Sequence, residues 1–284
     1  MTIKQAITKG MIMLKSNNVE SPKLKARLLL QYVLDKPRQY IIVYDNKEID
    51  KQQQWQYFVN IEKLTKGIPL QHITHRQEFM KMDFFVDENV LIPRPDTEIL
   101  VEKVIEILKN KKNTCSVLDM CTGCGAIGIS IAKYIPKADV YVSDISKSAL
   151  QIAKKNALKN GVENIHFILS DRFKSIYKKD FDIIVSNPPY IETDMIKDLP
   201  TEVKNEPHLA LDGGSDGLDF YRTLSNQSIS YLKSNGYLCL EIGYQQKEEV
   251  SKLLKNYFKN IASGFICSLH YNFCLLLVQI LRII

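Results

Sequence analysis

Apolar residues recur at helical spacing through roughly the first 75 residues of the chain. The first stripe consists of Ile3, Ile7, Met11 and Leu14. A second stripe follows Ser21-Pro22, a pair typical of a helix start, and a third lies between Asp50 and Gly67. No group of catalytic side chains accompanies these stripes. The pattern therefore predicts a small helical bundle over 1–76 that recognises or docks a partner.

The apolar period then changes. Residues 77–92 place phenylalanine, methionine and valine around polar positions at shorter spacing, which predicts a β-hairpin linker. From residue 114 onward, apolar runs typical of strands alternate with helical patterns. The strand-like runs are 117–120, 140–143, 165–169, 181–185 and 237–242. Such alternation requires parallel pairing and right-handed crossovers. We therefore expect an α/β fold over 93–284, a doubly wound Rossmann-like sheet with helices on both faces.

The run 181–185 ends at Ser186-Asn187-Pro188-Pro189-Tyr190. Proline has no N–H and fixes its own φ, so a strand stops here and a stiff turn follows. In open α/β sheets, ligands bind at the carboxyl ends of strands. The Asn187 carboxamide oxygen and the Pro188 carbonyl can accept both hydrogens of one NH2 group, and Tyr190 can stack on the planar group that bears it. The bland alternative is a proline turn that only closes a strand.

A glycine-rich loop follows the first strand of the predicted sheet. It consists of Asp119-Met120-Cys121-Thr122-Gly123-Cys124-Gly125. Gly123 and Gly125 allow close backbone approach, and Asp144, 25 residues after Asp119, ends the next strand. An acidic side chain there can accept both ribose hydroxyls of a nucleoside. Because the loop lacks a phosphate-binding Lys-Ser/Thr pair, it favours a cofactor with adenosine and an amino-acid end over ATP.

The stretch Ser170-Asp171-Arg172-Phe173 follows the third strand. Asp171 can accept the amino group of adenine while Phe173 packs on the ring, although an ordinary capped turn would have the same sequence. Cys121 and Cys124 form a C-x-x-C pair. No second pair and no nearby histidines supply further ligands, so we expect neither a metal site nor a redox role.

Composition and charge indicate the class of protein, its compartment and the charge of its possible partner. The 284 residues are 45% hydrophobic and 25% charged, as in soluble globular proteins. We expect no signal sequence at the start and no membrane span in the apolar tail, and six scattered cysteines suit a reducing cytoplasm. Residues 1–80 hold 13 Lys+Arg against 7 Asp+Glu, whereas the rest is balanced. This excess is either a set of solvated helix faces or a surface for an acidic partner.

The Asn-Pro-Pro-Tyr turn and the glycine loop together resemble class I S-adenosylmethionine-dependent amino methyltransferases. Further segments resemble the bacterial HemK/PrmC family, the release-factor glutamine methyltransferases, and the likeness covers about residues 20–260. These segments are Gln77-Glu78-Phe79, Asp83-Phe84-Phe85-Val86, Leu91-Ile92-Pro93-Arg94-Pro95-Asp96-Thr97-Glu98 and Gly213-Gly214-Ser215-Asp216-Gly217-Leu218. The tail, 262–284, does not match the family's usual ending.

The resemblance implies transfer of a methyl group from S-adenosylmethionine to the glutamine side-chain amide in the Gly-Gly-Gln loop of peptide chain release factors, which the helical domain docks. It implies catalytic roles for Asn187, Pro188 and Tyr190. The cofactor-binding residues would be Cys121, Thr122, Gly123, Cys124, Gly125, Asp144, Asp171, Arg172, Phe173 and Asn187. The substrate-binding residues would be Asn187, Pro188, Pro189, Tyr190, Arg94, Thr97 and Glu98. We expect a cytoplasmic monomer without stable nucleic-acid binding.

Two alternatives remain open on the sequence. An amino methyltransferase acting on adenine or cytosine in nucleic acid would use the same turn, because those bases also offer a planar NH2. Such enzymes usually carry a basic target-recognition region, whereas here the predicted catalytic half is charge-balanced. The other alternative is a non-catalytic nucleoside-binding module that docks on the ribosome through the basic helical domain.

Overall fold

The computed structural model describes residues 1–255, 257–258, 267–268 and 273–279. By its internal contacts the chain divides into two compact units. One unit comprises 1–76 together with 199–205, and the other comprises 77–198 together with the described residues from 206 onward. Among the described residues, no helix is long and apolar enough to cross a membrane.

The first unit is a helical bundle. Its helices are α1 (Ile3–Ser16), α2 (Pro22–Leu34), α3 (Arg38–Val43), α4 (Lys51–Thr65), α5 (Leu70–Thr74) and α9 (Thr201–Lys204). Capping boxes start α1 and α4: Thr2 and Gln5 exchange hydrogen bonds with each other's backbone N–H, as do Asp50 and Gln53. The buried faces of these helices form one apolar cluster around Tyr57.

The short helix α9 comes from the second half of the sequence but packs on the helical bundle. Asn205 donates a hydrogen bond from Nδ2 to the backbone oxygen of Lys66 (3.3 Å), and Lys25 forms an ion pair with Glu202. A Cβ at Gly67 would lie 2.4 Å from Thr201 Cγ2, so the two segments are in close contact. This grouping differs from the predicted division, which assigned all of 93–284 to one domain.

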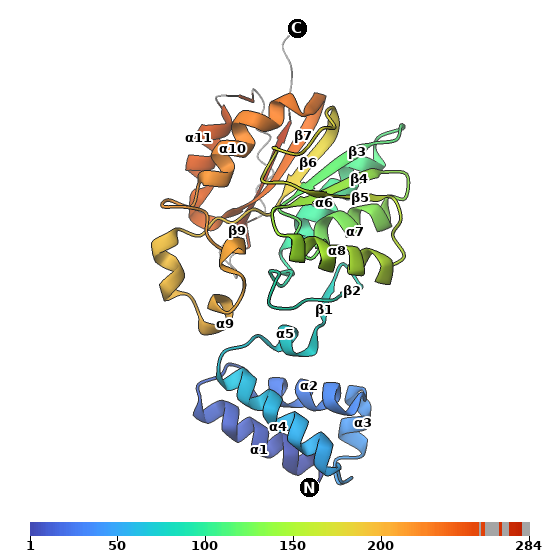
Figure 1. The fold of residues 1–284 in the computed structure, drawn as a ribbon, viewed down its shortest axis with the longest axis vertical. Coiled ribbons are helices and arrows are strands. Elements are labelled where there is room, and N and C mark those ends of the chain that lie inside the picture. The colour runs from blue at the N-terminus through green and yellow to red at the C-terminus, as the bar shows by residue number, and fades with distance from the viewer. Residues whose placement is uncertain (256, 259–266, 269–272, 280–284) are drawn as a thin grey trace. The chain divides into compact units, whose positions relative to one another are not determined.

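The second unit is an α/β domain (Figure 1). Its strands are β1 (Gln77–Phe79), β2 (Met82–Phe84), β3 (Ser116–Met120), β4 (Asp139–Asp144), β5 (Ile165–Leu169), β6 (Phe181–Ser186), β7 (Leu232–Gly243), β8 (Cys267–Ser268) and β9 (Phe273–Gln279). Its α-helices are α6 (Thr97–Lys109), α7 (Ala126–Tyr134), α8 (Lys147–Lys159), α10 (Asp219–Gln227) and α11 (Lys247–Lys255). The short 3-10 helices are η1 (Thr193–Asp198), η2 (His208–Ala210), η3 (Ser228–Ser230) and η4 (Tyr244–Gln246).

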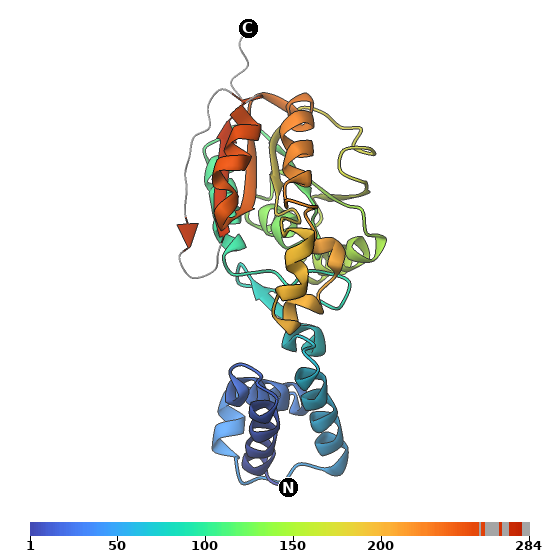
Figure 2. The same cartoon turned by 90° about the vertical axis from the view of Figure 1, so that its left-hand side faces the viewer.

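Seven strands form one sheet in the order β5-β4-β3-β6-β7-β9-β8. The strands β3 to β7 pair in parallel, whereas β9 is antiparallel to both β7 and β8. Successive residues of β3 face opposite ways, as in any strand. Val117 packs in the core shared with α6, α7 and α8, while Leu118 packs in the core shared with α10 and α11. Figures 1 and 2 show the sheet between these two helix layers. The predicted fold class is confirmed.

The hairpin is shorter than predicted. β1 and β2 pair over 77–84 only, and 85–92 forms no strand. Asn156 on α8 explains this early end, because its fully buried carboxamide takes over the polar groups of Phe85. The Phe85 N–H donates to Asn156 Oδ1 (2.7 Å), and Asn156 Nδ2 donates to the Phe85 and Cys124 carbonyls (3.0 and 2.9 Å). One side chain thus connects the hairpin to the glycine loop.

We expect Asn156→Ala to lower the free energy of unfolding by about 3 kcal/mol, because buried polar groups left without partners cost about 1–3 kcal/mol each. Chemical denaturation followed by circular dichroism measures the loss. Asn160→Ala, one turn later on the same helix, is the control, since its Nδ2 reaches backbone oxygens from a half-buried position. Equal losses for both variants would contradict this role of Asn156.

Candidate active site

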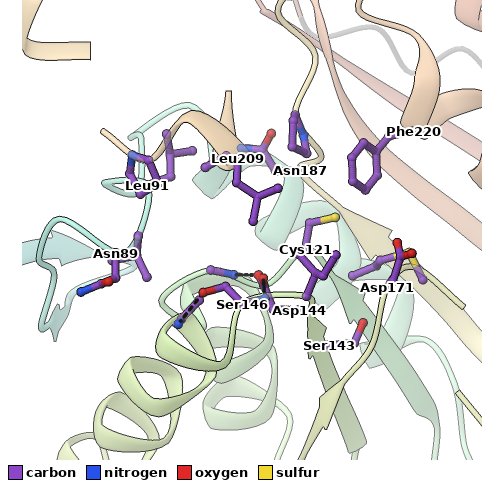
Figure 3. Close-up of a pocket in the computed structure, with 18 of the residues that line it drawn as sticks. Asn89, Leu91, Cys121, Ser143, Asp144, Ser146, Asp171, Asn187, Leu209 and Phe220 are labelled. Carbon is purple, nitrogen blue, oxygen red and sulfur yellow. Dashed lines mark hydrogen bonds between the residues drawn. The ribbon is translucent and has the colours of Figure 1, made fainter. Parts of the chain in front are cut away.

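A cavity of about 440 Å³ lies at the carboxyl ends of β3, β4 and β6. Figure 3 shows Cys121, Asp144 and Asn187 around it. Other segments complete the wall, and the residues used below are Leu91, Gly123, Asp171, Arg172, Pro189, Leu209 and Phe220. The cavity therefore combines the loop after β3, the end of β4 and the turn after β6, as the sequence predicts for a doubly wound sheet.

The loop after β3 brings its backbone to the cavity in left-handed conformations. Cys121, Gly123 and Gly125 have φ angles of +61°, +54° and +86°. A Cβ at Gly125 would lie 2.6 Å from Ile129 Cδ1, so this glycine is required for packing. A Cβ at Gly123 would meet nothing within 4 Å, so this glycine leaves open space beside the cavity.

Two carboxylates hold the loop. Asp144 accepts hydrogen bonds from the backbone N–H of Gly123 and of Ser146, both at 2.9 Å. Burial raises the pKa of Asp144 although these bonds act against the shift. Asp119 is fully buried, and its Oδ2 accepts from Thr122 Oγ1 (2.5 Å) and the Gly128 N–H (2.9 Å). Burial raises the pKa of Asp119 to about 7. Its Oδ1 has no hydrogen-bond partner within the described residues, which leaves one buried acceptor.

The turn after β6 is fixed from behind. Gln246 Nε2 donates to the Tyr190 carbonyl (2.9 Å), and a Cβ at Gly213 would lie 2.8 Å from Tyr190 Cα. Asn187 and Pro189 line the cavity, whereas Pro188 and Tyr190 do not. Burial, followed by the nearby Glu241, raises the pKa of the Tyr190 phenol, so the phenol is neutral at physiological pH. The predicted turn is therefore present, with Asn187 and Pro189 at the cavity.

The segment after β5 differs in part from the expectation. Asp171 and Arg172 line the cavity, but Phe173 is buried in the core and stacks on Tyr231 at 4.6 Å between ring centroids. The aromatic side chain at the cavity is Phe220, with the Arg172 guanidinium carbon 4.8 Å from its ring centroid. The left-handed backbone of Arg172, at φ +53°, accompanies the inward turn of the next residue.

The three substrate residues predicted around the start of α6, which are Arg94, Thr97 and Glu98, do not line the cavity. Arg94 forms an ion pair with Glu206, whose Oε2 also accepts from the Ile92 N–H (2.9 Å). Thr97 Oγ1 donates to Glu241 Oε2 (2.7 Å), and Glu98 accepts from the Met80 N–H (2.6 Å). The segment thus holds the walls of the cavity in place.

Comparisons with known proteins place this site in a family. Residues 5–74 match the PrmC N-terminal domain and residues 95–213 match the methyltransferase small domain. A release factor glutamine methyltransferase of Clostridium acetobutylicum is 44% identical over 262 residues, which covers 90% of this chain and 91% of that protein. The homologue of the same description from Moorella thermoacetica is 39% identical over 256 residues, with 90% of each chain covered.

The chain belongs to the release factor glutamine methyltransferases. Solved structures agree in fold alone. A ribosomal protein L11 methylase of Lactobacillus delbrueckii has a TM-score of 0.50 at 21% identity and covers 69% of this chain and 84% of its own. A 16S rRNA N2 G1207 methyltransferase of Thermus thermophilus, in complex with AdoMet and guanosine, has a TM-score of 0.53 at 18% identity. The match covers 72% of this chain and 49% of that chain.

The family match supports the predicted dependence on S-adenosylmethionine, and the site fits this group. Gly123 leaves room beside the cavity, and the half-buried Asp144 carboxylate lies next to it. Arg172 Nε is buried without a hydrogen-bond partner among the described residues, as is Asp119 Oδ1. Because Arg172 lines the cavity, its Nε is a donor that a bound polar group can use, whereas Asp119 does not line the cavity.

The cysteine pair is split between cavity and core. Cys121 lines the cavity, whereas Cys124 is buried beneath the loop. Burial raises the pKa of both thiols, that of Cys124 to about 12, so neither is a thiolate at neutral pH. Within the described residues, no group of three or more His, Cys, Asp or Glu side chains is placed to hold a metal ion.

Sequence reasoning missed four residues that shape the site: Glu206, Phe220, Glu241 and Gln246. One of them left a signal. Glu241 is a charged residue inside the apolar strand β7, near its carboxyl end. A charge buried in a strand costs free energy unless partners compensate it, so its presence indicates a specific interaction. The other three lie outside strands and have no comparable local signal.

Gly123→Ala should weaken S-adenosylhomocysteine binding, measured by calorimetry, by about tenfold, because the added methyl occupies space beside the cavity and tightens a left-handed position. Gly161→Ala is the matched control. Its φ is +63°, and a Cβ there would meet only Lys133 Nζ at 4.0 Å. Both variants should lose similar stability, and equal loss of binding in both would contradict the assignment of Gly123.

Proposed function

We propose that this protein transfers the methyl group of S-adenosylmethionine to the side-chain amide nitrogen of the glutamine in the Gly-Gly-Gln loop of peptide chain release factors. Two kinds of support meet here. Relatives described as release factor glutamine methyltransferases are 39–44% identical over nine-tenths of the chain. The observation that carries the proposal is the placement of Asn187 at the cavity that also contains Gly123 and Asp144.

The Asn187 carboxamide has a defined orientation. Its Nδ2 donates to Thr97 Oγ1 at 3.4 Å, so its oxygen is the end left to accept a hydrogen bond. We infer that this oxygen and the Pro188 carbonyl accept the two hydrogens of the substrate NH2. An amide nitrogen is a poor nucleophile because its lone pair is conjugated with the carbonyl. Two aligned acceptors increase its electron density and fix its position.

When bound, S-adenosylmethionine supplies a methyl group on a positively charged sulfur, which makes that carbon electrophilic. The amide nitrogen would form the new N–C bond as the methyl–sulfur bond breaks and S-adenosylhomocysteine leaves, and the nitrogen would then release one proton. An N-alkylated amide cation is strongly acidic, so no strong general base is needed. The contribution of the chain is therefore orientation and exclusion of water by residues such as Leu91, Leu209 and Phe220, which line the cavity.

The helical unit completes the proposal. Its match to the PrmC N-terminal domain supports a role in docking the release factor, and the excess of Lys and Arg in 1–80 suits an acidic partner surface. We infer that Cys121, Asp144 and Asp171 contact the cofactor. We further infer a monomer that acts in the cytoplasm without stable binding to nucleic acid.

Incubation with methyl-labelled S-adenosylmethionine should label a release factor. It should not label the same factor with its loop glutamine changed to alanine, and it should not label DNA. Label on DNA alone would favour a base amino methyltransferase. Label on no substrate, together with tight cofactor binding, would favour a non-catalytic nucleoside-binding module.

Asn187→Ala should lower kcat by about 10²-fold or more, because it removes one aligned acceptor at the reacting nitrogen. It should change cofactor affinity less than Asp144→Ala, which removes the acceptor pair at the end of β4. Steady-state kinetics and calorimetric titration of both variants separate the two roles. The reverse order of cofactor affinities would refute this assignment.

A further inference from the structure

Glu241 is a buried carboxylate behind the Asn187 turn. It lies near the end of β7 and is only 3% exposed. Its Oε2 accepts the hydroxyl hydrogen of Thr97 at 2.7 Å, and Thr97 Oγ1 in turn accepts from Asn187 Nδ2 at 3.4 Å. Burying a carboxylate costs free energy unless hydrogen bonds compensate. Because Glu241 does not line the cavity, direct contact with a ligand does not account for its presence.

The two ends of a carboxamide have nearly the same shape, so its hydrogen bonds determine which end faces a ligand. Thr97 has a single hydroxyl hydrogen, which it donates to Glu241. The Thr97 oxygen therefore presents lone pairs to Asn187 Nδ2, 3.4 Å away. An ionised carboxylate offers only acceptors. Glu241 thus fixes the direction of the Thr97 hydroxyl, and the Thr97 oxygen selects the NH2 end of Asn187.

We propose that Glu241 is a positioning residue: its ionised carboxylate, through Thr97, holds the Asn187 carboxamide with its oxygen toward the substrate NH2. This inference rests on the proposed function of the turn as the site that holds an NH2 group. Glu241 acts through Asn187 and makes no contact with the substrate. Thr97, expected from sequence to bind substrate, instead links Glu241 to Asn187.

The orientation of the Asn187 carboxamide depends on the protonation state of Glu241. Burial raises the pKa of its carboxyl to about 7, while hydrogen bonds from Thr97 and Asn187 act against this shift. Of the charged groups before α6, Asp96 raises and Arg94 lowers the pKa of Glu241. The Tyr190 and Tyr221 phenols, from the turn after β6 and from α10, also face it and are neutral because their pKa values are raised. Protonated Glu241 becomes a donor and no longer fixes the direction of the Thr97 hydroxyl, so the selection of the NH2 end of Asn187 is lost.

The first test is Glu241→Gln, which keeps the shape and removes the acceptor-only character. We expect kcat for methylation of release factor to fall by about 10²-fold, while KM for release factor and the affinity for S-adenosylhomocysteine change less than about twofold. Wild-type kcat should fall as the pH drops through about 7, and this acidic limb should be absent in Glu241→Gln. Glu241→Asp, which keeps an acceptor-only group, should recover part of kcat and retain the limb.

Asp182→Asn is the matched control for loss of a buried carboxylate. Asp182 lies at the opposite end of β6 and accepts from Lys111, Lys233 and the Ser116 N–H. This variant should lose thermal stability but retain kcat. Asp119 also has a pKa of about 7, but its effect is expected in cofactor affinity because it holds the glycine loop. Wild-type kcat in Glu241→Gln, or equal kcat loss in Asp182→Asn, would overturn the inference.

A spectroscopic readout separates this inference from the proposed function. In ¹⁵N-asparagine-labelled protein, the Asn187 side-chain amide signal is assigned by its loss in Asn187→Asp. We expect that signal to titrate near pH 7 in the wild type and to stay constant in Glu241→Gln. An Asn187 signal that titrates equally in both proteins would refute the role of Glu241, whether or not release factor is methylated. Absence of release-factor methylation with a Glu241-dependent signal would refute only the proposed function.

Discussion

The parallel pairing of β3 with β6 is the constraint on which the site depends. Met120 pairs with Ser186 at the end of both strands, and Ser186 Oγ donates to the Met120 carbonyl at 2.6 Å. The next residues, Cys121 and Asn187, therefore begin their loops side by side at one edge of the sheet. Because β4 lies on the other side of β3, the chain leaves β3 and β6 in different directions and a crevice opens between the loops.

Buried carboxylates then fix what lines that crevice. Asp119 holds the glycine loop, Glu206 holds the segment before α6, and Glu241 accepts from Thr97, which in turn accepts from Asn187. In a low-dielectric interior such hydrogen bonds are strong, but ionising the group is costly. The pKa values of Asp119 and Glu241 are raised to about 7, so the folded state retains their protons more readily than the unfolded state. Their contribution to stability is thus present below the unfolded pKa and is lost as pH rises through about 7, the range in which the ionised form is needed.

Sequence patterns predicted those parts of the site that have local signals. The apolar runs that end at Asp144 and before Asn187 locate strand ends, and a double proline or a glycine-rich loop follows directly from backbone chemistry. The pairs that support these residues join distant positions, Thr97 with Glu241 and Arg94 with Glu206, and no periodicity reports such contacts. The predicted contact of Phe173 with adenine differs from the structure for a related reason. Which of several aromatic residues reaches a cavity depends on the backbone of a single turn. Here the turn at Arg172 directs Phe173 into the core.

The turn therefore specifies a chemical group more than a substrate. In the proposed function, an NH2 group on adenine, cytosine or glutamine would meet the same acceptors at this turn. What differs is the body behind that group, and this body meets the walls formed by 88–91 and 207–212. Glu206 precedes the second wall and binds Ile92 and Arg94 beside the first, so both walls are fixed to a single carboxylate. We therefore expect substrate selection to depend on these walls, whereas the turn after β6 supplies the acceptor common to all three substrates.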